Sequence, residues 1–206
     1  MTKRSYRSTV RAAAAQETRD AILRAAMDLF AADGYVRTTV TAIADRAGVG
    51  VNTVYTSVGG KPALVGALAR EGTDDAAIDT TLAEIQAMTD GMRILRRTAE
   101  GTAEVTRRRE ALLRMLRDNA TSDPAVAAAA ELAVRRYRER LTLTAERLAE
   151  VGAVRFDSAR TEQILWFYFG DTTWSTVRQL GWTWADGARW LADQAATALL
   201  IDPAPA

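Results

Sequence analysis

The residues best suited to chemistry lie between Thr39 and Lys61 of the 206-residue chain. A short stretch begins at Val40, turns at Gly48-Val49-Gly50 and is followed by a second stretch, VNTVYTS, that begins at Val51. The second stretch offers amide and hydroxyl side chains, which hydrogen-bond base edges and phosphates. Lys61 then adds a positive charge, which suits a phosphate. These residue types in this order predict recognition of nucleic acid.

Two short helices, expected over about 40–47 and 51–58, must position these side chains. Each is too short to be stable alone in water, so an apolar set must lock the pair together. Gly48 lets the chain double back, because glycine adopts positive φ without strain. The layout is that of a helix-turn-helix, whose second helix enters the major groove of DNA. The apolar set is Ile43, Ala47, Val49, Val54 and Val58.

A wider run of motifs accompanies this pair. In chain order the motifs are Phe30-Ala-Ala-Asp-Gly34-Tyr35, Thr38-Thr39-Val40, Ile43-Ala44, Ala47-Gly48-Val49, Thr53-Val54-Tyr55 and Lys61-Pro-Ala-Leu64. Through them, the stretch from Gln16 to Leu68 resembles the DNA-binding domain of TetR-type (tetracycline-repressor-like) bacterial transcriptional regulators. The resemblance covers roughly a quarter of the chain. The rest is similar only in length and in its all-helical character.

The resemblance implies a role for each matching residue. Phosphate contacts fall on Thr53, Tyr55 and Lys61. Base-facing positions fall on Thr41, Val51, Asn52 and Thr56, and Thr39 and Ser57 complete the expected DNA-binding set. Two residues depart from the family pattern: Val58 stands where phenylalanine is common, and Ser57 where an aromatic residue or histidine is common. The core there is therefore expected to be smaller, and a histidine contact to phosphate is missing.

Composition argues against an enzyme. The chain has no cysteine and no histidine, so thiolate and imidazole chemistry are excluded. It has no glycine-rich phosphate loop and no paired-carboxylate motif at a useful spacing. We therefore expect no catalysis, no metal and no cofactor. The alternative to a regulator is a helical protein-interaction or lipid-surface module with a vestigial helix-turn-helix.

The ends and charges of the chain bear on location and partners. No run approaches the roughly 18 apolar residues of a membrane span, and no apolar leader follows the start, so we expect a cytoplasmic protein that does not bind membranes. Residues 1–61 hold nine Lys/Arg against five Asp/Glu, whereas residues 62–206 hold eighteen against twenty-one. The basic head suits DNA.

The arm over 1–15, with Lys3, Arg4, Arg7 and Arg11, either follows the DNA or is a disordered tail, and the tail is favoured.

Helix formers dominate and runs of β-branched residues with a period of two are missing, so the expected fold is all-α. It comprises the arm, a three-helix DNA-binding head over 16–71, and a larger C-terminal helical bundle over 72–206 for dimerisation and ligand binding. The first helix is expected to begin near Gln16. Later helices are expected over 61–71, 75–89, 91–119, 124–151, 158–180 and 184–200. Their ends follow from caps at Asp123 and Thr183 and from glycines at 34, 48, 152 and 181.

The last helices are rich in aromatic residues, since all five tryptophans follow residue 165. Aromatic residues are enriched at interfaces, and the resemblance implies a homodimer built on the last two long helices. The alternative is the core of a single chain. A dimer would place two recognition helices about 34–36 Å apart and read a palindromic operator in double-stranded DNA. The candidate interface residues are Gly170, Trp174, Val177, Trp184, Leu191 and Leu199.

The resemblance also implies a repressor of neighbouring genes that a small-molecule effector releases from DNA. Methionine and aromatic side chains suit an adaptable apolar pocket, although ordinary core is the alternative for each. The arginine runs at 107–109 and 135–140 would either bind an anion or form a solvated lattice with nearby glutamates. The candidate effector-binding residues are Met88, Met92, Met115, Tyr137, Trp166 and Phe169.

Overall fold

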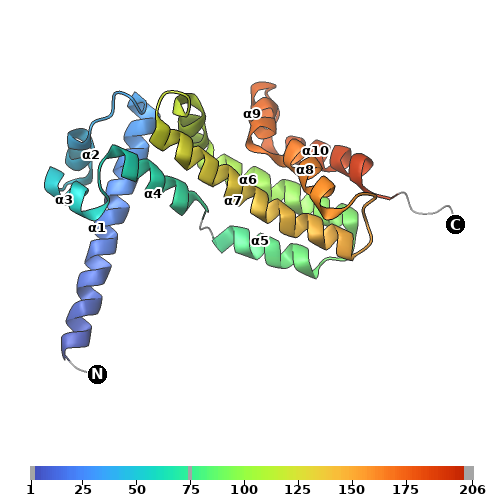
Figure 1. The fold of residues 1–206 in the computed structure, drawn as a ribbon, viewed down its shortest axis with the longest axis horizontal. Helices are drawn as coiled ribbons and strands as arrows, with labels where there is room; N and C mark the ends of the chain where they lie inside the picture. Colours follow the sequence, from blue (N-terminus) through green and yellow to red (C-terminus); the bar gives the residue numbers. More distant parts are fainter. Residues whose placement is uncertain (1–2, 74–75, 202–206) are drawn as a thin grey trace. The chain divides into compact units, whose positions relative to one another are not determined.

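The computed structural model describes the backbone of residues 3–73 and 76–201 and the side chains of residues 11–72 and 76–201. Over these ranges the chain is helical apart from its turns and one isolated bridge between Val154 and Leu200 (Figure 1). The all-α fold class is therefore confirmed. The helices are α1 (Lys3–Asp33), α2 (Val40–Ala47), α3 (Val51–Ser57), α4 (Lys61–Thr73), α5 (Ala76–Ala87), α6 (Gly91–Asn119), α7 (Pro124–Glu150), α8 (Ser158–Phe169), α9 (Asp171–Gln179) and α10 (Trp184–Leu199).

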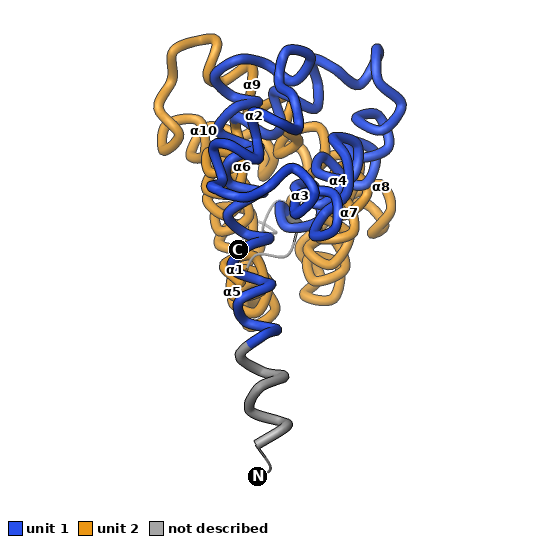
Figure 2. Tube along the Cα trace, turned by 90° about the vertical axis from the view of Figure 1, so that its left-hand side faces the viewer, with its two compact units in different colours: residues 1–72, 111–132 blue, residues 73–110, 133–206 orange. Residues whose placement is uncertain are grey.

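The chain divides into two compact units, shown in different colours in Figure 2. Unit 1 comprises residues 1–72 and 111–132, and unit 2 comprises residues 73–110 and 133–206. The head expected over 16–71 thus shares its unit with the end of α6, the α6–α7 turn and the start of α7. These added segments contribute their own buried side chains, among them Leu112, Leu116 and Val126. The long helices α6 and α7 therefore supply residues to both units.

α1 is longer than the sequence predicts, because it begins at Lys3 and not near Gln16. The alanine run 12–15 is a strong helix former, and no glycine or proline interrupts the stretch before it. The side chains of residues 1–10, which include Lys3, Arg4 and Arg7 of the arm, lie outside the described residues. Arg11 is exposed. The second half of α1 supplies the centre of unit 1 with Ile22, Leu23, Ala26, Leu29 and Phe30, all buried.

Unit 2 buries a single apolar cluster that draws on α5 to α10. Ile94 and Leu95 of α6 and Leu148 of α7 are completely buried in it. α8 and α9 add Leu165, Phe169, Trp174 and Val177, and α10 adds Ala188, Leu191, Ala192, Ala195 and Leu199. The run of small alanines on α10 lets neighbouring helices approach closely.

The helix expected over 158–180 is in fact two helices, α8 and α9, separated at Gly170. Gly170 leaves the helical conformation, with φ −67° and ψ 160°. A Cβ atom at this position would lie 2.6 Å from the carbonyl oxygen of Trp166. The missing side chain therefore allows the chain to break between α8 and α9. The sequence analysis placed the same glycine among the candidate residues of a dimer interface.

Most other helix ends follow their sequence signals. The Asp123 carboxylate caps α7 by accepting from the backbone N–H of Ala125 at 2.8 Å, and the Thr183 hydroxyl caps α10 by accepting from the N–H of Asp186 at 3.1 Å. The expected glycines adopt positive φ: Gly34 (85°), Gly48 (68°), Gly152 (66°) and Gly181 (78°). Local capping chemistry thus explains where these helices begin and end.

Two kinds of site receive no support from the described residues. No described helix combines the length and the apolar character needed to cross a membrane. Among the described residues, no three Asp or Glu side chains lie close enough together to hold a metal ion.

Candidate nucleic-acid interface and ligand pocket

α2 and α3 form the expected helix-turn-helix within unit 1. Thr39 caps α2 by accepting a hydrogen bond at 3.1 Å from a backbone N–H of its first turn. Gly48 ends α2 with φ 68°, and its N–H donates back to α2 carbonyl oxygens. Ile43 and Ala44 on α2 and Val54 on α3 are completely buried. These three side chains fix the position of α3 against the rest of the head.

The outer face of α3 presents the side chains expected to meet DNA. Val51 and Tyr55 are 38% and 53% exposed, and Asn52 and Thr56 are exposed as well. The Thr56 hydroxyl donates to the backbone carbonyl of Asn52 at 3.0 Å, so its oxygen remains able to accept. No residue of α3 is charged. Of the remaining expected contacts, Thr39 and Thr41 are exposed, and Thr53, Ser57 and Lys61 are half-buried.

Lys61 begins α4 and is held against the loop that follows α1. Its Nζ donates to the carbonyl oxygen of Val36 at 3.2 Å and lies 4.1 Å from the centroid of the Tyr35 ring. That distance is in the cation–π range. Burial lowers the pKa of Lys61, and the negative charge of Asp123 partly opposes this. An ammonium has three donors, so the tethered side chain retains capacity for a phosphate.

Tyr35 connects the head to the α6–α7 turn, a contact that the sequence did not reveal. Its hydroxyl donates to the Asp123 carboxylate at 2.7 Å, while its ring packs edge-on against Phe30 at 5.3 Å. Burial raises the pKa of Tyr35, and the hydrogen bond to Asp123 adds to the rise. The same hydrogen bond is the main cause that lowers the pKa of Asp123. One carboxylate therefore both caps α7 and binds the loop after α1.

Arg19 adds a second fastening inside unit 1. Its guanidinium donates to the backbone carbonyl oxygen of Ser57 at 3.2 Å. Ser57 is the last residue of α3, so the contact ties the C-terminal end of α3 to α1. A carbonyl at a helix C-terminus carries partial negative charge, which suits an arginine. Sequence reasoning did not single out Arg19.

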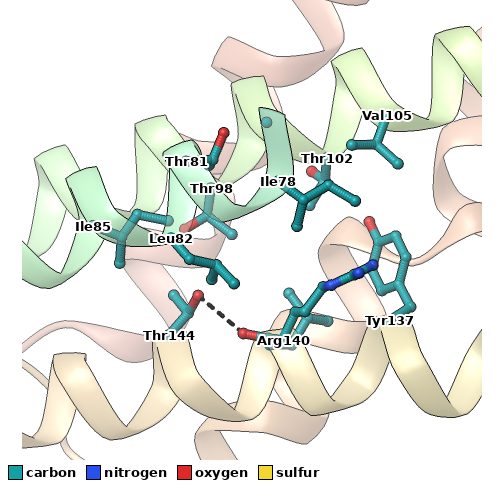
Figure 3. A pocket seen from close by; sticks show the side chains of 12 residues that line it. Ile78, Thr81, Leu82, Ile85, Thr98, Thr102, Val105, Tyr137, Arg140 and Thr144 are labelled. Atoms are coloured by element: carbon teal, nitrogen blue, oxygen red, sulfur yellow. Dashed lines mark hydrogen bonds between the residues drawn. The ribbon is translucent and has the colours of Figure 1, made fainter. Parts of the chain in front are cut away.

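A pocket opens in unit 2 between α5, α6 and α7 (Figure 3). Its volume, counted with the open mouth and the solvent space in it, is about 460 Å³. Much of the wall is apolar, with Ile78, Leu82 and Val105 among its residues. Its polar side chains are Thr81, Thr98, Thr102, Tyr137, Arg140 and Thr144.

Residues 22–68 match the family model described as "Bacterial regulatory proteins, tetR family". The matched range includes α2, α3, the buried half of α1 and the start of α4 that carries Lys61. Residues 22–68 are a TetR-family domain. No sequence among curated proteins matches the chain.

Solved structures extend the likeness beyond the TetR-family domain. A Mesorhizobium loti regulator assigned to the TetR family is 18% identical, with 91% of this chain and 98% of that chain covered at a TM-score of 0.71. FadR from Bacillus subtilis, in complex with stearoyl-CoA, is 16% identical with coverages of 86% and 97% and a TM-score of 0.70. SmeT, the repressor of the Stenotrophomonas maltophilia multidrug efflux pump SmeDEF, is 18% identical with coverages of 92% and 95% and a TM-score of 0.66. At these identities the matches establish a shared fold.

Only one of the six residues expected to bind an effector lines the pocket of unit 2. That residue is Tyr137, and the Trp166 ring packs edge-on against it at 5.5 Å. Phe169 is completely buried, and its carbonyl accepts the Tyr137 hydroxyl. Met88 and Met92 pack against the apolar cluster of the unit. Met115 is buried in unit 1, where it lines a separate, more polar cavity.

The residues expected at a dimer interface lie mostly inside the core of a single chain, which was the alternative for these side chains. Gly170, Trp174, Val177, Leu191 and Leu199 are buried, and Trp184 is half-buried against Trp174 at 5.8 Å between ring centroids. Exposed apolar side chains are found instead elsewhere on α8 and α10 and directly after the end of α9. Phe167 is 71% exposed, Leu180 62% and Trp190 48%.

The arginine runs are mostly paired with glutamates. Arg107 and Arg108 both approach Glu104, at 3.2 and 3.5 Å. In the second run, Arg136 pairs with Glu139 at 3.2 Å, and Arg138 makes two hydrogen bonds to Glu162, at 2.8 and 2.7 Å. This agrees with the charge-lattice alternative for these residues. Arg140 differs because it lines the pocket.

Proposed function

We propose that this protein is a transcriptional regulator that reads double-stranded DNA through α3 of its TetR-family domain. The observation that carries the proposal is the outer face of α3, where exposed amide, hydroxyl and apolar groups stand on a helix held by the buried Val54. A recognition helix needs such rigid support, because base readout depends on a few precisely placed hydrogen bonds. The absence of charge on α3 suits contact with base edges.

The expected contacts divide into two groups. Asn52 is suited to the edge of adenine, and the methyl groups of Val51 and Thr56 to thymine. Tyr55 and Lys61 are suited to phosphates on either side of the groove. Lys61 reaches a phosphate with its remaining donors or by leaving the Val36 carbonyl.

We propose further that the regulator is a homodimer and that its operator is a palindrome. Support comes from Phe167, Leu180 and Trp190, large apolar side chains of α8, the end of α9 and α10 that are strongly exposed in a single chain. Exposed aromatic side chains are typical of the centre of protein interfaces. Two copies related by a two-fold axis would present two α3 helices to successive turns of the major groove.

Control by a small molecule completes the proposal. The pocket of unit 2 has the mixed apolar and polar wall of a ligand site, and the similar FadR structure holds stearoyl-CoA. SmeT is described as a repressor. By analogy, this protein represses genes until a ligand occupies the pocket and favours a conformation with lower affinity for the operator.

The test compares DNA binding by the native protein and by a double variant, Tyr55→Ala with Lys61→Ala. Fluorescence anisotropy with duplexes enriched by the native protein, at about 150 mM salt, limits non-specific phosphate binding. We expect the double variant to lose at least ~100-fold in affinity while its fold is unchanged, because two phosphate contacts are removed. The matched control, Phe156→Ala with Arg160→Ala, also removes one exposed aromatic residue and one cation. Equal affinity of the two variants would refute the proposal.

A further inference from the structure

Lys61 is the one charged residue of the proposed DNA-binding set, and the protein itself holds its side chain. The ammonium lies 4.1 Å from the centroid of the Tyr35 ring and donates to the Val36 carbonyl oxygen at 3.2 Å. A lysine that becomes ordered only when it meets a phosphate loses rotamer freedom at that step, which weakens binding. A lysine that is held beforehand avoids this loss.

The Tyr35 ring that meets this ammonium is itself fixed in place. Tyr35 is 5% exposed, and the Phe30 ring packs edge-on against it, at 5.3 Å between ring centroids. The Tyr35 hydroxyl donates to the Asp123 carboxylate at 2.7 Å. Packing and hydrogen bond together determine where the ring lies, so the ring offers a stationary surface to the Lys61 ammonium.

Asp123 lies in the turn between α6 and α7 and is bonded to both helices. Its backbone N–H donates to the carbonyl oxygen of Asn119, the last residue of α6, at 3.1 Å. Its Oδ1 accepts from the N–H of Ala125 in α7 at 2.8 Å, and its Oδ2 accepts from the Tyr35 hydroxyl. The turn therefore fixes the carboxylate that anchors Tyr35.

The charges of these three residues support the same arrangement. The Asp123 carboxylate raises the pKa of Lys61, against a larger lowering caused by burial. In return, the charge of Lys61 is one of the causes that lower the pKa of Asp123. The attraction between the two charges and the face of the Tyr35 ring both favour the observed position of the ammonium.

We propose that Tyr35 and Asp123 are positioning residues for the contact of Lys61 with an operator phosphate. The Tyr35 ring and the Val36 carbonyl hold the ammonium, and Asp123 holds the ring. The ammonium has three donors, so it binds the phosphate with those that remain. Because Asp123 belongs to the α6–α7 turn, the same contacts make this turn a determinant of DNA affinity. The inference rests on the proposed function, because it explains how one of the proposed phosphate contacts is prepared.

The position of Lys61 can be measured without DNA, because the chain has only two lysines, Lys3 and Lys61. NMR of the full chain with isotope-labelled lysine should give two ε-methylene signals, which a Lys3→Arg variant assigns. Nuclei above an aromatic ring are shifted upfield, so we expect the Lys61 signal upfield of its value in the urea-unfolded protein. Tyr35→Leu should abolish this shift, and Phe156→Leu, which removes a ring from unit 2, should preserve it. An unshifted Lys61 signal in the native protein overturns the proposal.

A double-mutant cycle tests the role in DNA binding. Fluorescence anisotropy with a duplex enriched by the native protein measures the effect of Tyr35→Leu in the native chain and in the Lys61→Ala variant. We expect Tyr35→Leu to weaken binding about five- to tenfold in the native chain, but less than about twofold once Lys61 is absent, because the two residues act together. Ile22→Ala, which removes buried packing elsewhere in α1, should have the same effect in both backgrounds. Equal losses for Tyr35→Leu in both backgrounds, or unchanged affinity of Lys61→Ala, overturn the proposal.

Two substitutions of Asp123 test the contribution of the turn, and they replace the cycle if Tyr35→Leu does not fold. Asp123→Asn keeps an oxygen that can accept from the Tyr35 hydroxyl, and Asp123→Ala keeps none. Both remove the negative charge, so a difference between them reports the hydrogen bonds. We expect Asp123→Ala to bind the duplex about threefold more weakly than Asp123→Asn, and the two to bind equally in the Lys61→Ala background. Equal binding of the two folded variants with Lys61 present overturns the role of Asp123.

The two measurements separate this inference from the proposed function. Duplex binding that Lys61→Ala weakens, with no dependence of that loss on Tyr35, overturns the positioning role and leaves the regulator intact. If the native protein binds no duplex while the Lys61 signal is shifted as expected, the proposed function is overturned, and the hold of Tyr35 on Lys61 remains as a contact within the fold.

Discussion

The α2–α3 pair and the pocket of unit 2 are built in opposite ways. In the first, the side chains proposed to contact DNA are exposed or half-buried. They lie within 23 residues of sequence, from Thr39 to Lys61, and are supported by three completely buried residues. In the second, the working groups line a hollow between α5, α6 and α7 and come from positions 78 to 144. A surface site needs only a short, rigid scaffold. A pocket, in contrast, forms only when several helices pack at the right positions relative to one another.

This difference determines which substitutions each region tolerates. Changes on the outer face of α3 remove contacts to DNA and leave packing intact. Changes beside the pocket alter binding and core packing together, because residues such as Ile85 and Leu141 belong to both. Substitutions that lower affinity for the binding partner without lowering the stability of the fold should therefore be common in the head and rare in unit 2.

The largest loss of stability is expected from alanine substitution of a glycine that ends a helix, and each of the two regions offers one such position. Gly170→Ala forces a Cβ to within 2.6 Å of a backbone oxygen, so we expect a loss of about 3 kcal/mol or more in the free energy of unfolding. Gly48→Ala meets no atom within 4 Å and is strained only by its φ of 68°, which costs about 1–2 kcal/mol. Urea titrations of both variants measure the difference. A larger loss for Gly48→Ala would contradict this account of the break between α8 and α9.

A smaller effect is expected from a residue that is proposed to contact DNA but does not contribute to the packing of the head. Asn52→Ala should weaken binding to the preferred duplex by about 1–3 kcal/mol and relax preference at one base pair in each half-site. Its melting temperature should match that of the native protein, because Asn52 is exposed. Competition with duplexes changed at single positions checks this, and a uniform loss at all positions would assign Asn52 to phosphate instead.

A still smaller effect is expected at the contact between the head and the α6–α7 turn. Tyr35→Phe removes the hydroxyl that donates to Asp123 and keeps the ring against Phe30. A hydrogen bond to a charged group contributes about 1.5 kcal/mol or somewhat more. Chemical unfolding at pH 7 measures the loss, and Tyr55→Phe, which alters an exposed tyrosine, is the matched control.

The smallest expected effect is the pH dependence of that contact. The pKa of Asp123 is lowered in the folded protein, mainly by Tyr35. A depressed carboxyl pKa contributes stability that is present above the unfolded value, about 3.8–3.9, and is lost as the pH falls toward the folded value. The stability difference between native protein and Tyr35→Phe should therefore be constant from pH 5 to 8 and shrink below about pH 4. A difference that grows in acid would show that the bond does not favour the charged carboxylate.

Local signals predicted the bounds of α2 and α3 well. Thr39, Gly48 and the buried pattern of Ile43 and Val54 specify α2 and α3 within a residue of their observed ends. α6 spans 91–119 as expected, because its ends coincide with a glycine and a turn before Pro124. Such boundaries depend on neighbours a few residues away, which a sequence pattern displays directly.

Contacts between distant residues could not be predicted in this way. Tyr35 and Asp123 are 88 positions apart, and nothing local to either residue indicates the other. The sequence predicts a pocket lined by methionines and aromatic residues, but apart from Tyr137 and Arg140 the polar side chains that line it are threonines. Threonines on helices usually bond their own backbone, as Thr144 does with the carbonyl of Arg140 (Figure 3), so their type alone does not mark a pocket.

The central claim, that α3 reads DNA in a dimer, is tested most directly by selection from a random duplex pool at about 150 mM salt, where non-specific binding is suppressed. The account predicts an enriched palindrome whose half-sites are centred about 10 base pairs, or a multiple of one helical turn, apart. The Tyr55→Ala, Lys61→Ala double variant should enrich nothing. An enriched unpaired half-site would contradict the dimer, and no enriched motif from folded protein would contradict sequence reading by α3.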